Sequence, residues 1–371
     1  MNRVILTYDG TDAIIHGSKI DQNAFIKDGE LREYVNAIPT FSFKVFPNNP
    51  GYSSIENMLS TLTVSNFNQT DTIFDGRVCS IANVMTKNGL IYKNVTCEGE
   101  LAYLKDIIIE SYSVNTGTLL SSALSELMNQ YNSKAAADKQ FNVSSDNTGV
   151  PAYYSVTYKT AFDIVKDLCD MCEFEYRVSK INGIRYLEAS SQFGQRSNTD
   201  IALSVNLRSL QKENKVNDIV TRFYPLGINK ENDTYFTIAP YAQGRTYLSD
   251  SNLYNKYGLI EASKVYDDIT ISSSSEMVAG ARKLYARARK DYSQMVGLLT
   301  SFTLSALDLS LINGDYNDLK LYNTHRVVTK LQSIDEEVRI TGRVLKLDDP
   351  QNPALTFGVK QATLTSMVAR G

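Results

Sequence analysis

The chain is poor in the residues that most often carry enzymatic chemistry. Its 371 residues contain no tryptophan, four cysteines and only two histidines, His16 and His325. We find no H-E-x-x-H zinc motif, no G-x-S-x-G nucleophile motif, and no phosphate-binding or EF-hand loop. We therefore expect no catalytic residues, no cofactor and no metal ion. Each histidine is assigned a structural role or contact with solvent.

A basic excess is also lacking. Lysine and arginine number 38 against 41 acidic residues, a net charge of −3, which argues against a protein that binds nucleic acid regardless of sequence. No segment approaches the roughly 18 apolar residues that a membrane-spanning helix needs. The first residues, MNRVILTYDGTD, lack the apolar core of a signal peptide. We expect synthesis in the cytoplasm, where structural disulfides are rare, and no membrane insertion by this chain.

Half of the cysteines form a C-x-x-C pair in DLCDMCEFEY, residues 167–176. This spacing fits a redox dithiol, half of a zinc site, or two small apolar residues on a helix. The other cysteines, Cys79 and Cys97, lack the spacing that would complete a zinc site. Packing is favoured over metal binding and redox chemistry, because both thiols lie on a helical apolar stripe. The stripe consists of Ala161, Phe162, Val165, Leu168, Cys169 and Cys172.

The 23 tyrosines and 14 phenylalanines favour strands and hydrated interfaces. Residues 1–110 are rich in alternating patterns such as TFSFKVF at 40–46, typical of a small barrel or sandwich. Asp75-Gly76 predicts a hairpin or bulge. Residues 111–195 contain two amphipathic helices, the first with Thr118 as its expected N-cap, and a hairpin turn at Asn182-Gly183. They predict an α+β module.

Residues 196–371 contain strand patterns on both sides of one helix, for which Ser275 is the expected N-cap. We interpret this arrangement as a barrel interrupted by an inserted module. The helix carries a basic face opposite its apolar stripe. This face is either a solvated surface or a binding surface for nucleic acid or an acidic partner. The basic residues are Arg282, Lys283, Arg287, Arg289 and Lys290.

The stretch NLRSLQKENKVNDIVTRFYPLG resembles the signature of phage tail hub proteins, the prophage endopeptidase tail or tail-associated lysin family, which is similar to myophage baseplate hubs. Further segments match the family in order, from IPTFSFKVFPNNPGYSSIENM near the start to the closing strands. The resemblance covers essentially the whole chain. The residues that carry the motif are Asn206, Leu207, Thr221, Arg222, Pro225, Leu226 and Gly227.

The resemblance implies a mainly β fold with α+β insertions, in which two small related β-barrel domains are combined with two inserted α+β modules. The expected parts are a first barrel (1–110), an α+β insert (111–200), a discontinuous second barrel (201–230 and 294–360), a second insert with the basic helix (231–293) and a C-terminal tail (361–371).

The resemblance also implies a structural role in the virion, at the distal tail tip or baseplate, where host attachment takes place. Such hubs are homotrimers that adapt a sixfold tail tube to a threefold tip, because each subunit offers two similar barrels. The implied partners are a hexameric distal tail protein or tail tube, the tape-measure protein, and a spike or fibre protein on the C-terminal side. DNA would pass through the hub without specific binding, so we expect the basic helix to face outward or toward a partner.

Two alternatives stay open. One is a cell-wall-degrading tail peptidase or glycosidase, since the family name implies an endopeptidase. The other is a tail-tip protein that binds a receptor or carbohydrate. The residues of a zinc or cysteine peptidase are missing from this sequence, so we expect no lytic activity in this chain.

Overall fold

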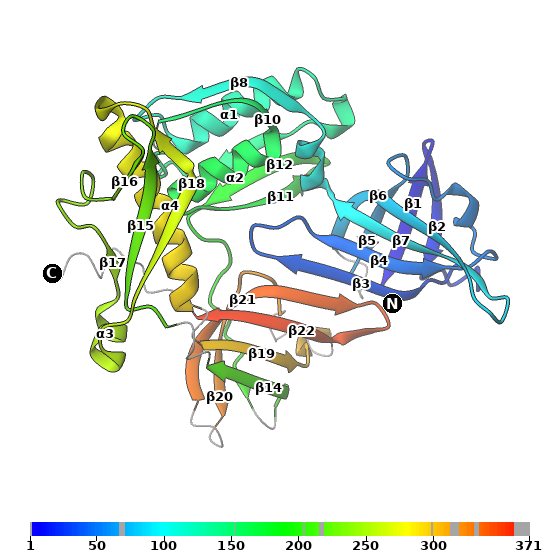
Figure 1. Cartoon of the computed structure of the whole chain (residues 1–371). Coiled ribbons are helices and arrows are strands. Elements are labelled where there is room, and N and C mark those ends of the chain that lie inside the picture. The colour runs from blue at the N-terminus through cyan, green and yellow to red at the C-terminus, as the bar shows by residue number, and fades with distance from the viewer. Residues whose placement is uncertain are drawn as a thin grey trace. The chain divides into compact units, whose positions relative to one another are not determined.

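The computed structural model describes residues 2–66, 71–151, 153–202, 205–214, 219–297, 300–311, 319–329 and 334–359. The chain forms two compact units, and each is built from separate stretches of sequence. Unit 1 comprises Met1–Tyr103, Phe193–Gln211 and Thr303–Phe357. Unit 2 is made chiefly of Leu104–Gln192 and Lys212–Phe302. The helices and strands are labelled in Figure 1.

Unit 1 contains two groups of strands, which we call the first and second strand sets. The first strand set contains β1 (Arg3–Tyr8), β2 (Thr11–His16), β3 (Lys27–Tyr34), β4 (Thr40–Val45), β5 (Thr61–Ser65), β6 (Thr72–Met85) and β7 (Ile91–Gly99). The second strand set contains β13 (Ile201–Ala202), β14 (Leu207–Asn214), β19 (Thr300–Ala306), β20 (Thr324–Thr329), β21 (Ile334–Lys346) and β22 (Asp349–Val359). Both sets belong to one 13-stranded sheet.

The first strand set encloses a single apolar core. Alternation along β4 buries Phe41, Phe43 and Val45, as the sequence pattern predicts. All seven strands contribute side chains to this core, so the sheet curls around its own apolar face. Each fully buried side chain of this size contributes about 1.5–3 kcal/mol to folding.

The two strand sets repeat one order of strands. The first set reads β3-β4-β7-β6-β5 across the sheet, and the second reads β14-β19-β22-β21-β20. The corresponding strands also follow one another in the same order along the sequence. The two predicted barrels correspond to these two sets.

Strand β3 of the first set and β21 of the second join the sets edge to edge (Figure 1). The pairing is antiparallel, with Gly342 opposite Tyr34 and Lys346 opposite Glu30. Between these ends, the Arg343 guanidinium donates to the Glu33 carboxylate over 2.6 Å, and both side chains are largely buried. The joint therefore combines backbone hydrogen bonds with a shielded ion pair.

The first stretch of unit 2 is an α+β module. Its elements are β8 (Ile108–Val114), α1 (Leu120–Asn132), β9 (Asn142–Ser145), β10 (Tyr154–Thr160), α2 (Ala161–Cys172), β11 (Glu175–Ile181) and β12 (Ile184–Ser190). Strands β8 and β10 form one sheet, and β9, β12 and β11 form another. The Asn182-Gly183 turn is confirmed: both residues have positive φ, and Ile181 pairs with Ile184.

The second stretch of unit 2 is built around a four-stranded sheet. Its elements are β15 (Arg222–Asn229), β16 (Thr234–Phe236), β17 (Leu248–Ser249), α3 (Ser251–Tyr257), β18 (Glu261–Ile271) and α4 (Met277–Gly297). Helix α4 packs on β15 and β18 and also contacts α2 of the first stretch. Short 3-10 helices complete the described chain at Tyr52–Ser54, Glu100–Lys105, Ala137–Lys139, Ser274–Glu276 and Leu309–Leu311.

The prediction of a mainly β chain with α+β insertions is confirmed. Strand β15, which the sequence prediction assigns to the second barrel, pairs with β16, β17 and β18 in the sheet of unit 2. The first stretch of unit 2 runs from Leu104 to Gln192, and the bounds 111–200 of the first insert stay a prediction. Residues 361–371 lie outside the described part of the chain.

Three local predictions were wrong. Asp75 and Gly76 lie inside β6, opposite Thr63 and Leu62 of β5, and form no hairpin. Leu119, not Thr118, is the N-cap residue of α1. Ser275 lies within a 3-10 turn that precedes α4. At Gly76 the small residue is needed because a Cβ would lie 2.2 Å from the Glu98 carbonyl oxygen.

We predict that Gly76→Ala destabilises the first strand set, because backbone would have to move to admit the methyl group. The expected loss in the free energy of unfolding is about 2–3 kcal/mol, measured by denaturant titration. Gly89→Ala is the matched control. A Cβ at Gly89 meets nothing within 4 Å, and only its φ of +77° opposes the change, at about 1 kcal/mol. Equal losses in the two variants would contradict the prediction.

Candidate functional site

His16 and His325 are both buried in unit 1, on β2 and β20 respectively. The Ile26 backbone N–H lies 3.4 Å from His16 Nδ1, which therefore accepts as a neutral imidazole. His325 Nδ1 lies 3.0 Å from the Thr199 carbonyl oxygen. Burial lowers the pKa of both rings. Both histidines are thus packed within the fold, as the structural interpretation predicted.

The C-x-x-C pair lies at the end of α2, with both thiols free. Cys169 is fully buried, which confirms the packing interpretation for this residue. Cys172 is only half-buried, and burial raises the pKa of its thiol to about 12, although the nearby Arg282 opposes the shift. A raised pKa disfavours the thiolate that redox and metal chemistry require. Among the described residues, no group of three or more His, Cys, Asp or Glu side chains is placed so that it could bind a metal ion.

One part of the family motif forms a turn in unit 1. Asn206 is buried, its Oδ1 accepts from the Ala202 N–H over 3.0 Å, and its Nδ2 donates to the Asp200 carbonyl oxygen over 3.2 Å. Leu207 follows as the first residue of β14. The Asn206 side chain therefore shapes the entry into this strand.

The remaining motif residues start the sheet of unit 2. The buried Thr221 hydroxyl donates to the Gly258 carbonyl oxygen over 2.9 Å and accepts from the Ile260 N–H over 2.8 Å. Arg222 stacks on the Tyr247 ring at 4.3 Å from its centroid. Pro225, Leu226 and Gly227 continue along β15. These positions hold strands together, so the structure places the motif in the architecture of the chain.

The basic face of α4 has partners within unit 2. Arg289 lies 3.1 Å from Glu173, and Arg287 lies 3.8 Å from Asp291 on the next turn. Arg282 lies over the Tyr241 ring, at 6.0 Å from its centroid, and Lys283 lies over the Tyr153 ring at 5.9 Å. The Lys290 side chain lies outside the described residues. The local partners reduce the positive charge that this helix offers to a ligand.

The apolar side chains of α4 lie mostly on its buried face. Ala281, Leu284, Ala288 and Tyr292 are buried, whereas Val278 is 59% exposed. The Tyr292 hydroxyl also donates to the Val220 or Thr221 carbonyl oxygen over 3.1 Å. The helix thus supports the sheet whose strand β15 begins at the motif residue Arg222.

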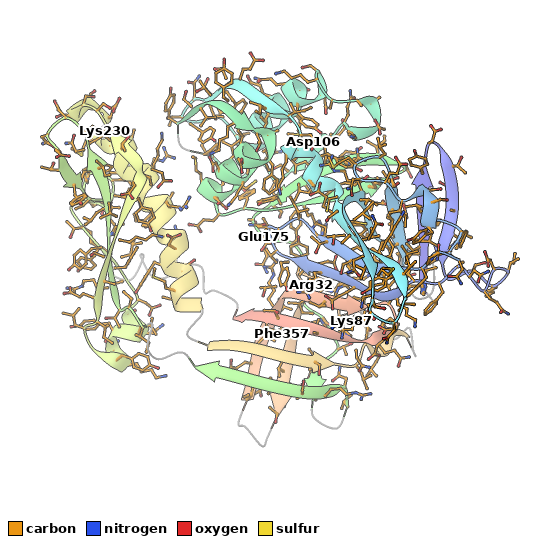
Figure 2. The ribbon with its side chains drawn as sticks, turned by 45° about the vertical axis from the view of Figure 1, so that its right-hand side comes forward. Arg32, Lys87, Asp106, Glu175, Lys230 and Phe357 are labelled. Atoms are coloured by element: carbon orange, nitrogen blue, oxygen red, sulfur yellow. The ribbon has the colours of Figure 1, made fainter. Side chains whose placement is uncertain are left out.

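The sequence patterns did not predict the exposed apolar tip of the β6–β7 hairpin. Strand β6 pairs with β5 only as far as Arg77, whereas its pairing with β7 continues to Met85. Beyond Arg77 only β6 and β7 continue as a two-stranded ribbon. The side chains at its tip are largely exposed: Met85 (74%), Leu90 (52%) and Ile91 (47%). Lys87, labelled in Figure 2, lies in the turn. Exposed apolar side chains gathered at one projecting tip are typical of an interaction surface.

A family model described as Prophage endopeptidase tail matches residues 195–368. This part of the chain is similar to the prophage endopeptidase tail family. The match includes the second strand set, the motif residues and the whole second stretch of unit 2. A search of curated proteins found no sequence match.

The fold of the whole chain is similar to that of solved prophage tail proteins. The 43 kDa tail protein of prophage MuSo2 from Shewanella oneidensis matches with a TM-score of 0.67 at 12% identity, over 97% of this chain and 98% of that one. A tail protein from Neisseria meningitidis matches with a TM-score of 0.65 at 11% identity, over 97% of both chains. The prophage tail protein gp18 of Listeria monocytogenes matches with a TM-score of 0.60 at 12% identity, over 99% and 98%. The similarity of fold therefore extends beyond the residues that the family model matches.

Acid should weaken the fold through His325. Its pKa is 6.5 in an unfolded chain and lower when buried, so the unfolded state binds more protons below about pH 7. We predict that the free energy of unfolding falls as pH drops from about 7.5 to 5.5, at up to about 1.4 kcal/mol per pH unit for this group.

Denaturant titrations across this range provide the measurement. His325→Gln should reduce the pH dependence of the free energy of unfolding. His16→Gln should remove only the contribution of His16, the second buried imidazole. A His325→Gln profile as steep as that of the wild type would contradict the assignment.

Proposed function

We propose that this chain is a structural hub at the tip of a phage or phage-like tail. The observation that carries the proposal is the repeated strand order of unit 1, where two equivalent strand sets are joined in one chain. The prophage tail family match and the similarity to solved prophage tail proteins support it.

The physical role follows from symmetry. A ring of six identical subunits offers six equal surfaces, and a threefold tip matches it only if each tip subunit presents two similar surfaces. Three copies of a chain with two equivalent strand sets present six. A homotrimer would therefore adapt a sixfold tail tube to a threefold tip.

The partners that we propose follow from this position in the virion. A hexameric distal tail protein or the tail tube would lie on one side, with the tape-measure protein ending at the hub. A spike or fibre protein would lie on the other side. One relative of this fold, the E. coli c3393 protein, is described as a component of the type VI secretion system similar to the T4 tail proteins gp27 and gp5; it matches with a TM-score of 0.52 at 12% identity, over 91% of this chain and 74% of that one.

DNA would pass such a hub without specific binding. The basic helix α4 fits this view, because Arg287 and Arg289 are directed to carboxylates of the same unit. We propose that α4 acts in holding unit 2 together and faces outward or toward a protein partner. Among the described residues, no helix is long and apolar enough to cross a membrane.

We also propose that the chain is not an enzyme, although its family is named for an endopeptidase. His16 and His325 are packed against backbone groups, and the described residues hold no metal-binding cluster. An activity of the tail on the cell wall would then reside in another protein.

We predict that antibodies against this chain label one end of purified tails, and that quantitative mass spectrometry finds half as many copies as subunits in one tube ring. Tails from a strain lacking the gene provide the labelling control. Purified chain should leave peptidoglycan intact in a zymogram that includes a known muralytic enzyme. Labelling along the whole tail, or clearing of peptidoglycan, would count against a structural hub.

A further inference from the structure

The sequence contains three Asn-Gly pairs, and two of them lie in exposed hairpin turns. Asn88 and Gly89 connect β6 to β7, and Asn182 and Gly183 connect β11 to β12 (Figure 1). All four residues are exposed. The third pair, at positions 313 and 314, lies outside the described residues. The two described turns therefore allow a direct comparison of one dipeptide in two hydrogen-bonding environments.

An Asn-Gly pair can react with itself. The glycine nitrogen loses its proton and attacks the asparagine Cγ. The N–Cγ bond forms and the Cγ–Nδ2 bond breaks, so that the amide nitrogen takes up one proton and leaves as ammonia. The product is a five-membered succinimide, which water opens at either carbonyl to give aspartate or isoaspartate. Glycine favours this attack because no Cβ shields its nitrogen.

The Gly89 nitrogen is held by a hydrogen bond within its turn. Its N–H donates to the Thr86 carbonyl oxygen over 2.9 Å. The Thr86 N–H donates to the Leu90 carbonyl oxygen over 2.9 Å, and the Leu90 N–H donates to Thr86 Oγ1 over 3.1 Å. Three hydrogen bonds thus fix the turn, and one of them engages the hydrogen that the reaction must remove.

The Gly183 nitrogen has no such restraint. Ile181 pairs with Ile184, and the φ angles of Asn182 and Gly183 are +53° and +79°, which is typical of a two-residue type I′ turn. The residues that flank such a turn make its closing hydrogen bonds. Within the described part of the chain, no group accepts from the Gly183 N–H or binds the Asn182 side chain. The attacking nitrogen and the amide that it attacks are therefore both open to solvent.

The end of the β11–β12 hairpin can also open without disturbing the module. The reaction requires the Asn182 backbone to leave its left-handed conformation so that the two reacting atoms meet. The hairpin is anchored at Arg185, whose buried guanidinium donates to the Asp138 carbonyl oxygen over 2.9 Å. Beyond this anchor, Ile181 and Ile184 are 55% and 48% exposed. A turn with few buried contacts opens at low cost in free energy.

We propose that Asn182 is a site of spontaneous modification, at which attack by the Gly183 nitrogen converts the side-chain amide into a carboxylate. Asn88 keeps its amide for longer, because the hydrogen bond from the Gly89 N–H to Thr86 must break before the same attack. Both reacting groups belong to this chain, and water is the only other reactant. The inference does not depend on the proposed hub function.

The modification changes both the charge and the backbone of the hairpin. Aspartate at position 182 adds a negative charge. Isoaspartate adds a methylene group to the main chain, so the turn no longer matches the register in which Ile181 lies opposite Ile184. The strands behind the turn are held by the ion pair of Arg177 and Glu188 over 2.6 Å. We therefore expect the change to stay local to the tip of the hairpin.

The first experiment follows both sites in the full chain by peptide mapping with mass spectrometry, during incubation in mildly alkaline buffer. Amide loss at Asn182 should be roughly tenfold faster than at Asn88, a ratio that corresponds to about one backbone hydrogen bond. The chain unfolded in urea is the control, and its two rates should be similar because neither turn is present. Peptide mapping also separates both sites from Asn313.

The second experiment identifies the product with matched variants. An isoaspartyl methyltransferase, which transfers a methyl group from S-adenosylmethionine, labels isoaspartate in the peptide that contains position 182. Asn182→Gln should abolish this label, because attack on a glutamine side chain requires a less favourable six-membered ring. Asn88→Gln should leave the label unchanged. Circular dichroism checks that both variants retain their strands.

Equal rates at Asn182 and Asn88 in the folded chain would overturn the inference. So would an Asn182 amide that persists in the folded chain while the unfolded chain loses it. Neither outcome bears on the hub function, which depends on the labelling and copy number in purified tails. Faster amide loss at Asn182, with isoaspartate in the same peptide, supports the inference whatever the position of the chain in a tail.

Discussion

The pairing of β3 with β21 is the contact on which the rest of unit 1 depends. It joins residues that are 310 positions apart, as in the ion pair between Glu33 and Arg343. Without it the chain would hold two separate sheets, each with an additional exposed edge. With it, the two strand sets have a fixed register, and Leu345 and Leu347 of the second set complete the core of the first. The two sets are therefore one structure rather than two linked ones.

The insertions leave this sheet intact because they enter at connections between strands. The first stretch of unit 2 joins the two sets, and the second lies between β14 and β19. The equivalent connection between β3 and β4 spans only residues 35–39. Contacts between α2 and α4, including the pair of Glu173 and Arg289, combine the two stretches into one unit. Basic residues of α4 thus help to hold the two stretches of unit 2 together. The number of lysines and arginines in the sequence does not predict this role.

Local sequence patterns predicted much of the fold. Alternation at Phe41, Phe43 and Val45, the helical stripe around Leu168 and Cys169, and the Asn182-Gly183 turn each predicted the observed structure, because each depends on neighbours close in sequence. The partner of β15 could not be predicted in this way. Its alternating burial suits either the barrel or the sheet of unit 2, and strand pairing over long separations has no local signal. The exposed Met85 was missed for the same reason, since an apolar residue in a strand gives no indication of whether its neighbouring strand ends early.

The late position of Leu347 in the sequence has a consequence for synthesis. Ribosomes add about 5–20 residues per second. Strand β21 is synthesised 310 positions after β3, so roughly 15 to 60 seconds pass between the synthesis of the two strands. During that time the core of the first strand set lacks two side chains and the β3 edge is uncovered. A nascent chain on a neighbouring ribosome could use its own β21 to cover that edge, which would exchange strands between copies. Correct folding therefore depends on how soon β21 of the same polypeptide follows β3. The long stretches of unit 2 between these strands increase that interval.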